Sequence, residues 1–142
     1  MDKPSDGDDP IGQEVRALLS IKIQSIEQLE VVLFLRERLG HAWTPSALAA
    51  KLHLTSSEAE GALRQLRSAR LVDVVRSDST TSFRYLPGDS NLSETVERLA
   101  LEYQQSPLEI VRIISANAIE RVRTGTLRFF ADSFVLGKKR DG

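Results

Sequence analysis

One segment, from Thr44 to Arg76, limits the possible folds more than any other, because two helix start signals lie close together in it. Thr44 is followed by Pro45, a pair typical of a helix N-terminus, where the N–H that proline lacks would have no partner. Thr55 and Glu58 then form a T-x-x-E capping box, which predicts the start of a second helix. Because the turn between the two helices is so short, they cannot lie in line.

Apolar residues occupy the positions that would fix the crossing of these helices. They are Leu48, Ala49, Leu52, Leu54, Ala59, Leu63, Leu66, Leu71 and Val72, and Thr55 stands at the turn between the helices. This spacing resembles the winged helix-turn-helix of bacterial transcriptional regulators in the MarR, ArsR and PadR-like superfamily, although it assigns the chain to no single family there. The resemblance covers about residues 44–86. It implies a mainly α fold with a small β-hairpin wing and additional C-terminal helices.

Two positions depart from the pattern of these regulators, which usually have glycine there. His53 stands in the turn between the helices, and Arg70 stands just before the strand. A left-handed backbone at a residue other than glycine costs on the order of 1 kcal/mol, which a fold can tolerate. We therefore expect the geometry of the motif to be kept.

The residues before the motif predict two further helices. A short helix follows Ile11, and Ser25 with Gln28 forms a capping box that opens a second helix, which ends near Gly40. The centre of this second helix, residues 31–35, is apolar throughout. It is predicted to be a central core helix, with the alternative that its outer face lies in a dimer interface.

The wing is predicted from two strand-like runs, Leu71 to Arg76 and Ser82 to Leu86. The polar residues 77–81 between them predict a five-residue loop. Trp43 is predicted to lie in a short strand that pairs with the wing.

Terminal helices are predicted after the wing. One begins near Ser93, and the pair Ser106 and Pro107 starts a longer one, in which Gly125 suggests a kink or a cap. Together the last helices span more length than a winged domain needs to cover itself, so their surplus apolar face needs a partner. In regulators of similar layout such helices commonly make the homodimer. The predicted dimerisation residues are Val111, Ile114, Ala118, Val122, Phe130 and Phe134.

Composition indicates a soluble protein with one folded domain and tails. The chain has 142 residues, a net charge of −1 and no cysteine, and no apolar run approaches the roughly 18 residues of a membrane span. The cytoplasm is the default location. The expected organisation is a disordered acidic tail over residues 1–10, a winged domain with N-terminal helices over 11–88, dimerisation helices over 89–136 and a basic tail over 137–142.

The sequence offers little for catalysis. His41 and His53 have no carboxylate at ligand spacing, no cysteine is present to act as a nucleophile or metal ligand, and no glycine-rich phosphate loop occurs. The chain is therefore predicted not to be an enzyme and to need no cofactor or metal.

The second motif helix carries the candidate DNA-binding residues. Because Ala59, Leu63 and Leu66 point inward, other side chains must form the exposed face, and the wing adds two arginines beside it. The candidate DNA-binding residues are Ser57, Gly61, Arg64, Gln65, Arg67, Ser68, Arg76 and Arg84. Arginine and glutamine suit guanine and adenine edges, whereas Glu58 and Glu60 would repel phosphates.

Two functions remain open from the sequence. The first is a homodimeric transcriptional regulator that binds double-stranded DNA. The alternative is a winged-helix adaptor that binds another protein through its hydrophobic terminal helices and binds no DNA. The four arginines of the motif and wing favour the first function, whereas the near-neutral charge favours the second.

Overall fold

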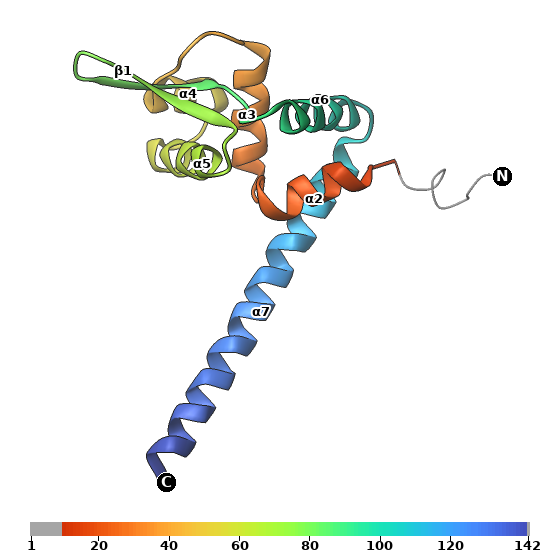
Figure 1. Cartoon of the computed structure of the whole chain (residues 1–142), viewed down its shortest axis with the longest axis vertical. Coiled ribbons are helices and arrows are strands. Elements are labelled where there is room, and N and C mark those ends of the chain that lie inside the picture. The colour runs from red at the N-terminus through yellow and green to blue at the C-terminus, as the bar shows by residue number, and fades with distance from the viewer. Residues whose placement is uncertain (1–9, 142) are drawn as a thin grey trace, which may run out of the picture.

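The structure, a computed structural model, describes residues 10–141, and within that range it places the side chains of all residues except 130 and 132–141. The predicted acidic tail therefore lies, apart from Pro10, outside the described residues. The described chain is mainly helical, with one two-stranded sheet (Figure 1). Its elements are α2 (Gln13–Ile21), α3 (Ile26–Glu37), α4 (Pro45–Leu52), α5 (Ser56–Ser68), β1 (Val72–Ser77), β2 (Thr80–Tyr85), α6 (Ser90–Gln105) and α7 (Pro107–Asp141).

The start signals of α4 and α5 are confirmed. The hydroxyl of Thr44 accepts a hydrogen bond from the Ala47 N–H, and Pro45 is the first residue of α4. In α5 both halves of the capping box form, because Thr55 accepts from the Glu58 N–H and Glu58 accepts from the Thr55 N–H. These caps satisfy N–H groups that a helix N-terminus would otherwise leave unpaired.

The box predicted for α3 is only half right. Ser25 caps the helix by accepting from the Gln28 N–H, but the Gln28 side chain accepts from the Gln24 N–H and not from Ser25. Burial explains the difference, since Gln28 is 7% exposed and its amide is held in the corner that precedes α3.

The core surrounds α3, as the apolar run in its centre predicts. Val31, Val32 and Leu35 are fully buried, and α3 packs against α4, α5 and β2. The long side chains from the other helices that complete this core include Leu19, Leu48, Leu63, Leu66, Leu99 and Ile110. The helix-turn-helix is therefore held on one side by α3 and joined through the core to the N-terminal and C-terminal helices.

The wing is an antiparallel hairpin in which Val72 pairs with Tyr85 and Ser77 pairs with Thr80. Its loop is shorter than predicted, because strand pairing continues to Ser77 and Thr80 and leaves two residues, with Asp78 in a left-handed conformation (φ 56°). The predicted strand at Trp43 is confirmed as an isolated bridge to Phe83, with backbone N···O distances of 2.8 Å in both directions.

The last two helices differ from the prediction in their limits. Asp89 caps α6 by accepting from the Leu92 N–H, so α6 begins before Ser93. The kink predicted at Gly125 is wrong, because α7 is one helix of 35 residues that continues through residues 137–141. Such a helix is about 52 Å long. No helix within residues 10–141 is long and apolar enough to cross a membrane.

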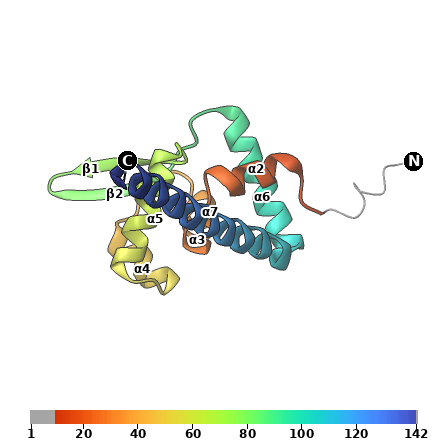
Figure 2. The ribbon, with the colours of Figure 1, turned by 90° about the horizontal axis from the view of Figure 1, so that it is seen from below.

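The first part of α7 packs against α2 and α6, and the rest of it projects away from the body (Figure 1). Figure 2 shows α7 crossing beneath α3, with its C-terminal end on the same side of the molecule as the wing. This arrangement places α5 and the wing at one end of the molecule, and within the described part of the chain residues 119–129 of α7 are exposed.

Candidate nucleic-acid interface

The two faces of α5 are separated as the sequence predicts. Ala59, Ala62, Leu63 and Leu66 are buried against the core. The predicted DNA-binding residues of α5 lie on the other side, where Gly61 is half-exposed and the rest are exposed: Ser57, Arg64, Gln65, Arg67 and Ser68. The helix therefore presents one continuous polar face outside the fold.

The turn before α5 fixes the direction of that face. His53 ends α4 in a left-handed conformation (φ 59°), and the Leu54 N–H donates to the Ala49 carbonyl. The capping box then begins α5 two residues later. The geometry expected at His53 is confirmed, and it sets the angle between α4 and α5.

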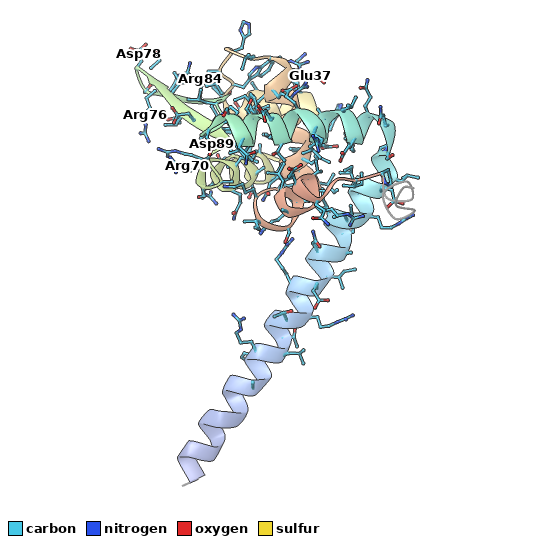
Figure 3. All side chains as sticks on the ribbon, turned by 45° about the vertical axis from the view of Figure 1, so that its right-hand side comes forward. Glu37, Arg70, Arg76, Asp78, Arg84 and Asp89 are labelled. Carbon is cyan, nitrogen blue, oxygen red and sulfur yellow. The ribbon has the colours of Figure 1, made fainter. Side chains whose placement is uncertain are left out.

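The junction after α5 brings a further arginine to the surface. Arg70 adopts the expected left-handed conformation (φ 66°), and its carbonyl accepts a hydrogen bond from the Gly88 N–H. Its side chain is exposed beside the wing (Figure 3). Arg70 was not predicted as a binding residue, although an arginine in place of the usual glycine at a surface turn was a signal that could have indicated it.

The wing places its two arginines differently. Arg76 is exposed near the loop, whereas Arg84 is half-buried opposite Asp73, and its Nε atom is buried with no hydrogen-bond partner in the described part of the chain. Figure 3 shows both side chains on the wing and Asp78 at its tip. The surface of the wing that is available to a nucleic acid is therefore formed mainly by Arg76.

Tyr85 at the base of the wing holds the hairpin to the body. It is 4% exposed, and burial raises its pKa to about 12. Ser93 lies near the Tyr85 hydroxyl, but this hydroxyl makes no hydrogen bond of acceptable geometry with any described residue.

Beside Tyr85, Arg36 of α3 forms a bidentate ion pair with Glu97 of α6, with distances of 2.6 and 2.8 Å, and this hydrogen bonding lowers the pKa of Glu97.

The arginines of the chain fall into two groups by their partners. Several arginines of α6 and α7 are paired within the chain, including Arg98 with Glu14 and Arg112 with Glu109. By contrast, the side chains of six arginines make no hydrogen bond or ion pair with any described residue: Arg64, Arg67, Arg70, Arg76, Arg84 and Arg128. Five of the six belong to α5, the wing or the junction between them, and the sixth, Arg128, lies on α7. Their positive charge is therefore available to a group outside the chain.

Acidic residues reduce the positive charge of this surface. Glu58, Glu60, Asp73 and Asp78 lie in the same stretch as the five arginines, so the excess is one positive charge. One carboxylate, that of Glu58, is committed to the capping box. The surface is thus positive through specific side chains rather than through a large net charge.

The predicted dimerisation residues are divided between two faces of α7. Ile114 is 2% exposed and lies in the core of its own chain, so it offers little surface to a second chain. Val111 and Ala118 are half-buried, and Val122 is 69% exposed. The side chains of Phe130 and Phe134 lie outside the described ones.

Other apolar side chains of α7 are exposed although they were not predicted as contacts. Leu108 is 74% exposed and Ile119 is 60% exposed. At 100° per residue, both lie with Val122 on the side opposite the buried Ile110 and Ile114. An apolar stripe thus runs along the outer face of α7.

Comparison with known proteins gives matches in structure but not in sequence. No protein-family model matches the chain, and a search of curated protein sequences finds no match. Two point mutants of MepR from S. aureus match over 84% of this chain with a TM-score of 0.50, one of them bound to an oligodeoxyribonucleotide and one from a clinical isolate. The DNA-bound mutant is 15% identical to this chain and is covered over 87% of its own length. The mutant from the clinical isolate is 14% identical to this chain and is covered over 86% of its own length. A homodimeric winged helix-turn-helix DNA-binding domain from Mycobacterium bovis matches at a TM-score of 0.49 and 15% identity, over 75% of this chain and 89% of its own.

The chain thus has a winged helix-turn-helix fold. In terms of that fold, α4 and α5 are the helix-turn-helix, α5 occupies the position called the recognition helix, and β1 with β2 is the wing. The fold class expected from the sequence is confirmed.

Proposed function

We propose that this protein is a homodimeric, sequence-specific DNA-binding regulator of transcription and not an enzyme. In this proposal α5 enters the major groove of double-stranded DNA, and Arg76 of the wing contacts the adjacent backbone. The observation that carries the proposal is the distribution of arginine partners. Arginines on α5 and the wing have no partner among the described residues, whereas many of those on the body are paired.

Five residues of the polar face of α5 have roles in this proposal. Arg64 lies at the centre of the polar face and suits a guanine edge, and Gln65 suits an adenine edge. Arg67 and Ser68, in the last turn, are placed to contact phosphates. Gly61 allows the backbone of the helix to approach the DNA, because no side chain stands between them.

Dimerisation through α7 is the second part of the proposal. Leu108, Ile119 and Val122 expose an apolar stripe on a helix that projects from the body, and a two-fold pair is the commonest way to cover such a face. In a two-fold dimer the two α5 helices would address half-sites about 34 Å apart. The preferred DNA site would then be a near-palindrome.

The test is a selection from pooled random duplexes, followed by titration of the selected duplex at two salt concentrations. The proposal predicts a near-palindromic site, two chains per duplex by light scattering, and affinity in the range of about 10⁻⁸ to 10⁻¹¹ M at physiological salt. If no duplex is enriched and binding at low salt is weaker than about micromolar, the protein is not a specific DNA-binding protein. The adaptor function would then replace it.

A further inference from the structure

The corner between α2 and α3, residues 22–25, is held by a dense set of hydrogen bonds. The Gln24 side-chain amide donates to the carbonyls of Ser20 and Ile21 at 3.3 and 3.1 Å, and so covers the C-terminal end of α2. The Gln24 N–H donates to the Gln28 side chain at 2.7 Å, and Ser25 caps α3. These bonds leave the corner little freedom to change shape. We call residues 22–25 the α2–α3 corner.

One side of the α2–α3 corner is bound to α7. The guanidinium of Arg121 donates to the Gln24 carbonyl at 2.9 Å, and the Asn117 amide donates to the Leu19 carbonyl at 3.4 Å. Both donors lie on the face of α7 that packs against α2, opposite the apolar stripe. The position of α7 is therefore fixed relative to the corner by hydrogen bonds as well as by apolar packing.

The other side of the α2–α3 corner reaches the recognition helix. The ammonium of Lys22 donates to the carbonyl of Ala69 at 2.9 Å, and Ala69 is the C-cap residue of α5. The C-terminal end of a helix carries partial negative charge and carbonyl groups without partners in the helix, so a cation there is stabilising. Lys22 is half-buried at this contact, which shields the bond from water.

We infer that Lys22 and Arg121 form a relay through the α2–α3 corner, by which α7 sets the position of the last turn of α5. Lys22 is a positioning residue in this relay, because it acts on DNA through α5 and not by its own contact. The last turn of α5 contains Arg67 and Ser68 and leads to the left-handed Arg70. A shift of α7, the proposed dimerisation helix, would thus reach the surface that meets DNA.

A physical coupling of this kind can be measured without DNA. The amides of Arg70 and Leu71 donate to the carbonyls of Arg67 and Leu66, both at 3.0 Å, so their hydrogen exchange reports on the end of α5. Lys22→Met keeps the apolar stem and removes the ammonium, and it is expected to speed exchange of these amides about tenfold or more, as a lost charged hydrogen bond does. Lys22→Arg keeps a cation at this place and is expected to restore slow exchange.

Arg121→Met tests whether the relay extends to α7. It is expected to speed exchange at the same two amides, and the double variant with Lys22→Met should exchange no faster than Lys22→Met alone, because both act on one connection. Arg123→Met is the matched control, since Arg123 lies on the same helix and pairs only with Glu120, at 3.8 Å, among the described residues. If Arg121→Met leaves the amides of Arg70 and Leu71 as slow as the control does, the relay does not exist.

The role in DNA binding rests on the proposed function and needs a separate measurement. Lys22→Met is expected to weaken binding of the selected duplex about fivefold with an unchanged salt slope, because a group that touches no phosphate releases no counterion. A slope lower by about one would make Lys22 a phosphate contact, and unchanged affinity would remove it from DNA binding; either result overturns the inference. If the unmodified protein binds no duplex, the proposed function fails, while the exchange measurement still decides whether the relay exists.

Discussion

Replacing Gly61 by alanine should make the protein more stable and its DNA binding weaker. Gly61 lies in the interior of α5, its φ is not in the left-handed region, and a Cβ built there meets no atom within 4 Å. Nothing in the described part of the chain therefore requires glycine. Glycine in the middle of a helix costs about 0.5–1 kcal/mol relative to alanine.

The two expected effects of Gly61→Ala have opposite signs. The free energy of unfolding should rise by about 0.5–1 kcal/mol, which raises the Tm by roughly 2–4 °C for a protein of this size. The affinity for the selected duplex should fall about tenfold or more, because forcing a methyl group into a close contact costs about 1–3 kcal/mol. Calorimetry measures the first effect, and fluorescence anisotropy with a labelled duplex measures the second.

Gly125→Ala is the matched control. Gly125 also lies within a helix, and a Cβ there meets no atom within 4 Å, but it belongs to α7, far from the recognition helix. The control should gain similar stability and bind DNA as tightly as the unmodified protein. If Gly61→Ala gains stability and keeps full affinity, DNA does not approach α5 at this residue. If it loses stability, the space beside Gly61 is not open, and the reasoning is refuted.

Three further predictions concern assembly, the wing and the cap of α5. Changing Ile119 and Val122 together to Asp should give monomers by light scattering that remain folded by circular dichroism, because both side chains are exposed within the chain; a monomeric unmodified protein at micromolar concentration would contradict the dimer. Tyr85 has its pKa raised to about 12 by burial, so the unfolded chain loses the phenol proton first and stability should fall as the pH rises from 10 to 12. Tyr85→Phe should remove this part of the fall in urea titrations and change stability little at pH 7, and an unchanged pH profile would count against burial of the phenol. Thr55→Ala should lower the free energy of unfolding by about 1 kcal/mol, since it removes the cap of α5; equal stability would show that the box is dispensable.

Features that depend on neighbours in the sequence could be predicted. The caps at Thr44 and Thr55 and the proline that starts α4 follow from local backbone chemistry, whereas the left-handed conformations of His53 and Arg70 were implied by the resemblance to winged helix-turn-helix regulators. The inward face of α5 follows from the helical period alone. Together these signals were sufficient for the fold class and for the exposed face of the recognition helix.

Features that depend on packing between distant segments could not be predicted. The bond from Lys22 to Ala69 and the ion pair of Arg36 with Glu97 join residues that no spacing rule connects. Burial of Ile114 in its own core has the same cause, because the helical period gives two apolar faces for α7 but does not say which one meets α2. For the same reason, the prediction could not distinguish arginines that are paired within the chain from those that are not.

Gly125 shows a limit of another kind. A single glycine lowers helix propensity by about 1 kcal/mol, which suggested a break, but α7 continues through it. The wing loop was overestimated because polar residues such as Ser77 and Thr80 pair as readily as apolar ones once the strands are in register. Local composition therefore located these elements correctly but not their ends.

The measurement that tests the central claim most directly is the affinity of Arg64→Ala for the selected duplex, compared with that of Arg98→Ala. Arg64 is exposed on α5 with no partner among the described residues, whereas Arg98 is exposed on α6 and paired with Glu14 at 3.1 Å. The account predicts that Arg64→Ala loses about 1–3 kcal/mol of binding free energy and relaxes specificity at one position, while Arg98→Ala binds as the unmodified protein does. An Arg64→Ala protein that is folded by circular dichroism and binds the duplex as tightly as before would contradict the account.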